Sequence, residues 1–107
     1  MARALINVPK TAKRGQIIEI KSLISHIMET GFRRTETGEV IPRNIITELL
    51  CTYNDAEIFR ATLYPAIAAN PFVTFFTIAK DSGTIVFKWT GDHGFEQTET
   101  AKIVVEG

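Results

Sequence analysis

The sequence predicts an all-β, immunoglobulin-like β-sandwich of about seven antiparallel strands. Apolar and polar residues alternate with period two along most of the chain, and the alternating runs are rich in β-branched and aromatic residues. Short turn signals separate these runs, among them Asp81-Ser82-Gly83 and Gly91-Asp92-His93-Gly94. A small β-barrel is the alternative architecture.

Each expected strand is a run in which one parity is apolar. The strands are expected at residues 3–8, 16–23, 44–53, 57–63, 72–80, 84–90 and 95–105. Successive side chains of a strand point to opposite faces, so one parity faces the core. The inward set comprises Ile18, Ile20 and Ile24, then Ile45, Leu49, Cys51 and Tyr53, and finally Ile85, Phe87 and Trp89.

The expected strand at residues 72–80 is apolar on both faces. Phe72, Phe76 and Ile78 share one face, and the other carries Val73, Phe75 and Ala79. Ile46 and Leu50 likewise fall on the outward parity of their strand. Because a two-layer sandwich needs one buried face per strand, this surplus is either covered by a loop or left as a patch for a partner.

Two segments lie outside the strand rhythm. Residues 25–43 form a segment far longer than a hairpin loop of about 2–5 residues, and loops of such length are usually functional or mobile. In residues 64–71, Pro65 and Pro71 bracket a helix-favouring run of alanine and isoleucine. We expect a short helical turn there that crosses between the sheets.

The composition limits the classes of partner. A chain of 107 residues fits one domain, residues 1–107, and its 45% hydrophobic content is typical of globular proteins. Twelve basic and 12 acidic residues give a formal charge of zero, which argues against binding nucleic acid or an anionic membrane. Asn7, Pro9, Lys10 and Lys13 interrupt any signal-peptide apolar run, and this alone would predict a cytoplasmic protein.

Few residues offer chemistry. Cys51 is the one cysteine, and its parity predicts a buried, inert thiol. His26 and His93 have no third ligand at a fixed spacing, so we expect no catalytic residue, metal or cofactor. The rival hypothesis is a small metal-redox or thiol enzyme on the same sandwich. It requires both histidines to converge with carboxylates, or Cys51 to be exposed.

Several runs resemble the SoxZ family, subunits of the bacterial sulfur-oxidising (Sox) system. The runs are residues 8–13, 15–21, 24–31, 41–46 and 63–71, and the most specific are Ser-His-Ile-Met-Glu-Thr-Gly at 25–31 and Pro-Ala-Ile-Ala-Ala-Asn-Pro at 65–71. The chain departs from the family pattern at Ile27, where a proline is expected, and at Tyr64, where a histidine is expected. Any role of that histidine is therefore not carried over.

The resemblance implies a non-catalytic scaffold. SoxZ proteins pair with SoxY, whose cysteine on a flexible tail carries the sulfur intermediates of thiosulfate oxidation to other Sox enzymes. Those enzymes would touch the pair transiently. SoxZ proteins reach the periplasm by co-export with their signal-bearing partner, so the same location is expected here. An isolated chain could form a homodimer through its apolar patch.

Partner contacts are expected on the long loop and the crossover, because loops on a rigid scaffold carry most interactions. The predicted contact residues are His26, Met28, Glu29, Arg33, Arg34, Tyr64, Ile67 and Asn70. Arg33, Arg34 and Arg43 could also form an anion-binding or docking cluster, although Glu29, Glu36 and Glu39 partly cancel their charge.

Overall fold

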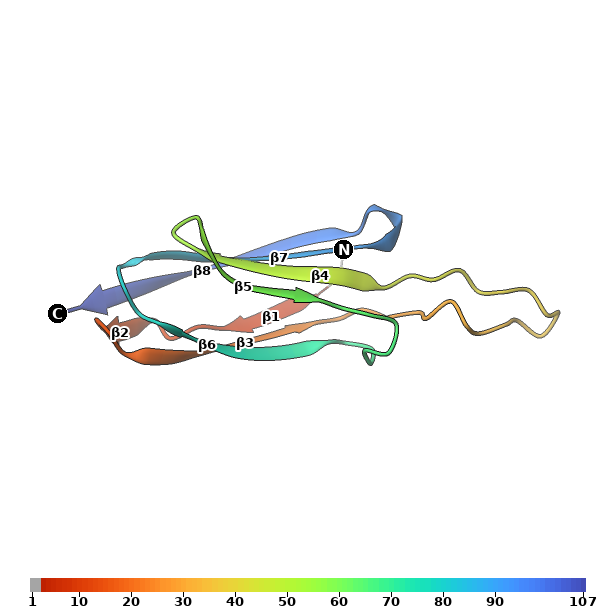
Figure 1. The fold of residues 1–107 in the computed structure, drawn as a ribbon, viewed down its shortest axis with the longest axis horizontal. Helices are drawn as coiled ribbons and strands as arrows, with labels where there is room; N and C mark the ends of the chain where they lie inside the picture. Colours follow the sequence, from red (N-terminus) through yellow and green to blue (C-terminus); the bar gives the residue numbers. More distant parts are fainter. Residues whose placement is uncertain (1–2) are drawn as a thin grey trace.

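The computed structural model describes residues 3–107, whose strands run along one long axis (Figure 1). The strands are β1 (Ala4–Asn7), β2 (Thr11–Lys13), β3 (Ile17–Ile24), β4 (Ile46–Tyr53), β5 (Ala56–Thr62), β6 (Phe72–Ile78), β7 (Gly83–Gly91) and β8 (Glu96–Glu106), with one 3-10 turn, η1 (Asp92–Gly94). The predicted strands are all present.

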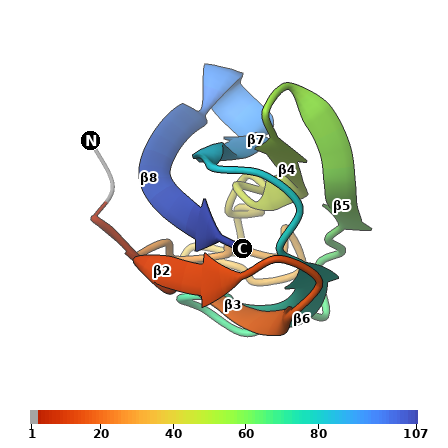
Figure 2. The same cartoon turned by 90° about the vertical axis from the view of Figure 1, so that its left-hand side faces the viewer.

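Two sheets face each other, as the view along the strands shows (Figure 2). One has three strands in the order β1-β3-β6, and the other has five in the order β2-β8-β7-β4-β5. The fold is therefore an immunoglobulin-like sandwich, as predicted. Strand β2 was not predicted, because three residues are too few to show alternation. It pairs parallel with β8, Thr11 lying opposite Val104, after Pro9 has ended pairing on the first sheet.

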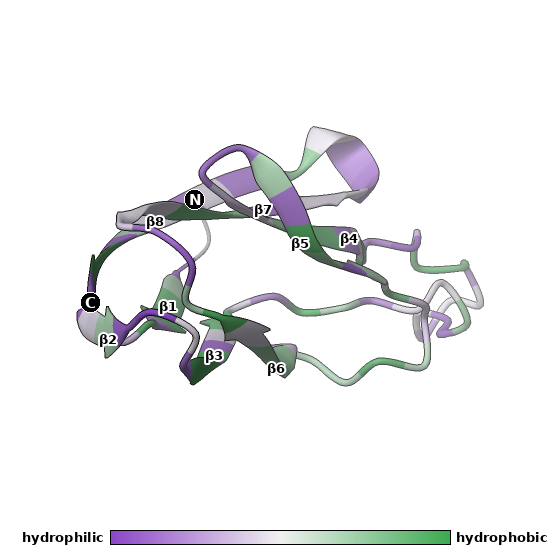
Figure 3. Ribbon diagram, turned by 60° about the vertical axis from the view of Figure 1, so that its left-hand side comes forward, coloured by the Kyte–Doolittle hydropathy of each residue, from purple (hydrophilic) through white to green (hydrophobic). Residues whose placement is uncertain are grey.

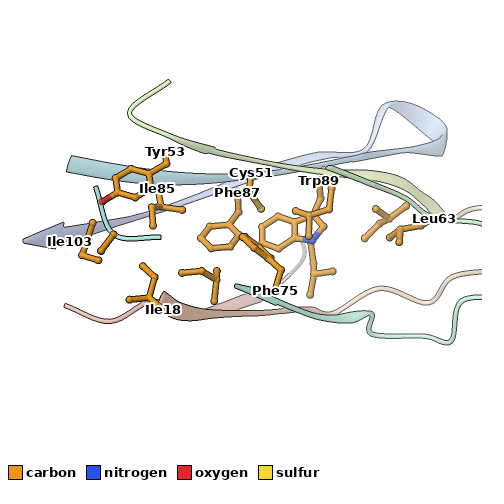
Figure 4. Close-up of a cluster of buried hydrophobic side chains, with 14 of the residues drawn as sticks. Ile18, Cys51, Tyr53, Leu63, Phe75, Ile85, Phe87, Trp89 and Ile103 are labelled. Atoms are coloured by element: carbon orange, nitrogen blue, oxygen red, sulfur yellow. The ribbon is translucent and has the colours of Figure 1, made fainter. Parts of the chain in front are cut away.

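The core lies between the sheets and is built from the predicted parity (Figure 4). Leu49, Phe87 and Trp89 are almost completely buried, and Phe75 packs on them from the opposite sheet. Ile46 corrects the prediction, since it was expected to face outward and is fully buried. The pairing of β4 with β7 shifts register between Ile46 and Glu48, and this bulge interrupts the strict alternation, so that Ile45 and Ile46 are both buried.

The long loop forms an extended two-stranded projection, which we call the arm (residues 25–43). It is joined by isolated bridges between Glu29 and Asn44 and between Arg34 and Val40. The arm lengthens the molecule to 63 Å, against 20 Å and 19 Å in the other directions (Figure 1).

Residues 64–71, which we call the crossover and for which a short helical turn was predicted, contain no helix. The segment does pass from the five-stranded to the three-stranded sheet, but only one turn forms, closed by the Ile67 N–H on the Tyr64 carbonyl oxygen at 2.9 Å. Pro71 disfavours right-handed helix at the preceding residue, and Asn70 adopts a φ of 55°. A run between two prolines is too short for a stable helix.

The core assignment makes a matched prediction about two leucines. Leu49 is fully buried, whereas the side chain of Leu5 is mostly exposed on the three-stranded sheet. Leu49→Ala should lower the free energy of unfolding by about 2–5 kcal/mol, because it leaves a cavity. Leu5→Ala should change it by less than about 0.5 kcal/mol. Urea unfolding followed by Trp89 fluorescence measures both, and equal losses would contradict the packing described.

Candidate partner-binding surface

A reciprocal pair of hydrogen bonds joins the base of the arm to the crossover. The His26 backbone N–H donates to Asn70 Oδ1 at 2.9 Å, and the Asn70 N–H donates to the His26 carbonyl oxygen at 2.8 Å. Asparagine tolerates the positive φ that this geometry requires. These bonds hold two segments that are far apart in the sequence side by side. Each segment contributes one of the predicted contact residues, His26 from the arm and Asn70 from the crossover.

The returning side of the arm is held by the turn between β7 and β8. Two of the Arg43 guanidinium nitrogens, Nε and Nη2, donate to the carboxylate of Asp92 at 2.8 Å. Asp92 also accepts the Ile45 N–H at 3.1 Å, and a 2.8 Å hydrogen bond joins His93 Nε2 to the Arg43 carbonyl oxygen. The hydrogen bonds from Arg43 and then Ile45 lower the pKa of Asp92. Hydrogen bonds therefore fix both ends of the arm to the sandwich, one at His26 and the other at Arg43.

The His26 side chain contacts both the arm and the sandwich through its ring. Its Nδ1 accepts the Met28 N–H at 3.0 Å, and the ring meets Phe95 edge-on with centroids 5.0 Å apart. Desolvation lowers the pKa of His26, although the charge of Asp92 opposes this shift. Met28 is buried, and its Sδ accepts the Ile46 N–H at 3.3 Å. Two residues predicted as partner contacts thus also build the base of the arm.

Three of the six charged side chains of the arm form ion pairs. Arg33 Nε and Nη2 donate to the buried carboxylate of Glu29 at 3.0 and 2.5 Å, and these bonds lower the pKa of Glu29. With Arg43 held by Asp92, the suggested cluster of three free arginines does not form. Arg34 donates to the Gly38 carbonyl oxygen at 2.9 Å and makes no ion pair within residues 3–107.

Apolar side chains on the arm and crossover remain open to solvent. Phe32 is 81% exposed and Tyr64 is 64% exposed. Hydropathy colouring shows hydrophobic residues spread along both segments (Figure 3). We call this set the arm-end surface: Ile27, Phe32, Val40, Tyr64 and Ile67. Exposed apolar residues on an anchored projection fit protein binding better than a small-molecule pocket.

The predicted contact residues differ in burial. Five are exposed, namely Arg33, Arg34, Tyr64, Ile67 and Asn70, whereas His26 is half-buried and Met28 and Glu29 are buried. Their roles as partner contacts remain predictions. Ile27, Phe32 and Val40 were not among the predicted contacts, although a large apolar residue in an otherwise polar loop is a signal for a binding surface.

The residues considered for catalysis are poorly suited to it. Cys51 is fully buried, and burial raises its pKa to about 12, so the thiol is protonated at neutral pH. Within residues 3–107, no group of three or more His, Cys, Asp or Glu residues is placed to hold a metal ion. The same residues include no helix long and apolar enough to cross a membrane.

Comparison with protein families decides the relationship. The family described as sulphur oxidation protein SoxZ matches residues 6–102. The chain belongs to the SoxZ family. A SoxZ-family chain is a component of the Sox sulfur-oxidation system, and the match extends from β1 into β8, including the arm and the crossover. Among curated proteins, none matches the sequence significantly.

Solved structures confirm the fold of this SoxZ-family chain. Superoxide reductase (neelaredoxin) from Ignicoccus hospitalis has a TM-score of 0.75 at 19% identity, covering 96% of this chain and 80% of that one. The sulfur carrier protein SoxY from Chlorobium limicola f thiosulfatophilum has a TM-score of 0.69 at 11% identity, covering 97% and 79%. A putative superoxide reductase from Thermotoga maritima has a TM-score of 0.71 at 16% identity, covering 97% and 86%. At these identities the likeness concerns the fold alone.

The His26 contact predicts a pH-dependent stability. Its folded pKa lies below the ordinary value of 6.5, so the unfolded chain binds more protons and the free energy of unfolding should fall as the pH drops from about 7.5 to 5.5. Protonation would also break the Met28 hydrogen bond. His26→Asn is the matched control, because its side-chain oxygen can accept the N–H two residues ahead without titrating. Urea unfolding across this range should show a smaller decrease for the variant, and identical decreases would contradict this role of His26.

Proposed function

We propose that this chain is the non-catalytic scaffold of a SoxY–SoxZ pair. It would bind the SoxY sulfur carrier, and together the two would present covalently bound sulfur intermediates to the enzymes of thiosulfate oxidation. The observation that carries the proposal is the SoxZ family match over residues 6–102.

The arm-end surface is the proposed docking site for SoxY. Its apolar side chains stand on segments fixed by the hydrogen bonds of His26 with Asn70 and of Arg43 with Asp92. A surface that is ordered before binding loses less conformational entropy when a partner arrives. Arg34, which has no ion pair in the described residues, can add a charged contact at the rim.

The chemistry of such a pair would belong to SoxY and the enzymes it visits. A carrier cysteine on a tethered tail reaches successive active sites at a raised effective concentration. This chain would fix the starting point of the tail and supply docking surface. The rival thiol-enzyme hypothesis would require an accessible thiolate, and the buried, protonated Cys51 offers none in the folded state.

The proposed location is the periplasm, by co-export with a signal-bearing SoxY. Such export requires the two subunits to bind before translocation and to remain folded together. A preformed docking surface with a largely apolar character would meet that requirement.

Co-purification tests the proposal. Co-expressed with the SoxY of the same genome, the chain should elute with it in size exclusion at micromolar concentration. Ile67→Asp should weaken the pair at least tenfold, about 1.4 kcal/mol, because it places a charge in an apolar contact. Val104→Asp is the matched control, since Val104 is also half exposed but lies on β8 near the opposite end of the molecule (Figure 1). Separate elution of the wild-type proteins would remove the scaffold function, and equal effects of both variants would remove the proposed site.

A further inference from the structure

The outer face of the three-stranded sheet is unusually apolar. Ile17 is 69% exposed, and Phe72 and Phe76 are 61% and 63% exposed. Of the two alternatives predicted for the strand at residues 72–80, which is apolar on both faces, the structure shows the exposed apolar patch. Neither the arm nor the crossover covers these side chains. We define this outer face by alternate residues of two paired strands: Ile17, Glu19, Lys21 and Leu23 of β3, and Phe72, Thr74, Phe76 and Ile78 of β6.

The outer face has an ordered charge pattern. Along β3 it carries an apolar residue, an acid, a base and another apolar residue, and Lys21 Nζ lies 3.3 Å from Glu19 Oε1. The register with β6 continues this order across the sheet, since Ile17 pairs with Ile78 and Leu23 with Phe72. Both ends of the face are therefore apolar, and its middle holds one negative and one positive side chain.

We propose that the outer face binds a second copy of this chain. The two copies would be related by a two-fold axis that lies in the plane between their three-stranded sheets, perpendicular to the strands and level with the midpoint between Glu19 and Lys21. This axis packs the two sheets face to face with their strands running in opposite directions. Glu19 then lies opposite Lys21 of the second copy, and Ile17 lies opposite Leu23 of that copy. A two-fold interface is made from one surface patch that complements itself, and this face does so in both charge and hydrophobicity.

The charges select this arrangement among the possible face-to-face pairs. A two-fold axis along β3 would set Glu19 against Glu19 and Lys21 against Lys21, and like charges directly opposite are destabilising. Strands of 7–8 residues at ~3.3 Å per residue and ~4.8 Å spacing give a face roughly 25 Å long and 10–15 Å wide. A face of this size makes a small interface, in which charge complementarity contributes mainly to register and orientation.

Reversal of the strands has a consequence for the whole assembly. The arm extends from the end of β3, so the two arms of the dimer would point in opposite directions (Figure 1). Both arm-end surfaces would remain free. If the proposed function holds, each would bind one SoxY, and the assembly would contain two copies of each subunit.

Sedimentation velocity of the isolated chain tests the dimer. The wild type should sediment as a dimer at about 100 µM. Glu19→Lys and Lys21→Glu should each weaken self-association at least tenfold, because each sets like charges opposite one another across the axis. An equimolar mixture of the two variants should restore the dimer, since every charge then meets its opposite on the other chain. Each variant has also lost its internal Glu19–Lys21 pair, so restoration can come only from contacts between chains.

Two outcomes would overturn the dimer. One is a monomeric wild type at 100 µM, and the other is a mixture that associates no better than the single variants, with near-ultraviolet circular dichroism showing that both remain folded. If the wild type is monomeric and Glu19→Lys abolishes co-purification with SoxY, the outer face binds SoxY instead. Failure of the arm-end site is distinguishable, because Ile67→Asp should leave self-association unchanged.

Discussion

Two sheets packed face to face bury one face of each strand, and this constraint governs which parts of the molecule can bind a partner. The inner faces are filled by large side chains such as Trp89, Phe87 and Phe75. Phe59 of the edge strand β5 stacks on Phe75 with centroids 4.3 Å apart, which closes the sandwich on its open side. Apolar residues beyond this core must lie on an outer face or on a projecting segment, and both occur here.

The anchoring of the arm converts a long loop into a defined surface. Four polar residues, His26 and Asn70 on one side and Arg43 and Asp92 on the other, satisfy backbone and side-chain groups at its base. Loops held in this way by a rigid scaffold are common sites of interaction. The arm-end surface and the outer face of the three-stranded sheet consist of different residues, and they adjoin where Leu23 and Phe72 lie next to the base of the arm and the crossover.

The sequence was sufficient to predict the strands and the side chains of the core, because period-two alternation reports directly on which face is buried. It failed where structure depends on contacts between distant segments. The burial of Ile46 results from a register shift against β7, and strand β2 exists only through its pairing with β8. The crossover was assigned from composition, and its conformation instead depends on Pro71 and on the bonds of Asn70 to His26.

The sequence indicated the two segments of the candidate site but not the contacts within them. The length of residues 25–43 and the two prolines of the crossover pointed to segments that the structure joins by hydrogen bonds, and their role in partner binding remains a prediction. The pairing of Glu29 with Arg33 and the burial of Met28 depend on how the arm folds back onto the sandwich, and no local pattern reports this. The pairing of Arg43 with Asp92 joins residues 49 positions apart, which places it beyond any motif in the loop itself.

Hydrogen–deuterium exchange of this chain with and without SoxY tests the central claim most directly. If the arm end is the docking surface, SoxY should slow exchange in residues 27–40 and 64–70 and leave β3 and β6 unchanged. Unchanged exchange in the arm and crossover, with slowing confined to the three-stranded sheet, would contradict the account.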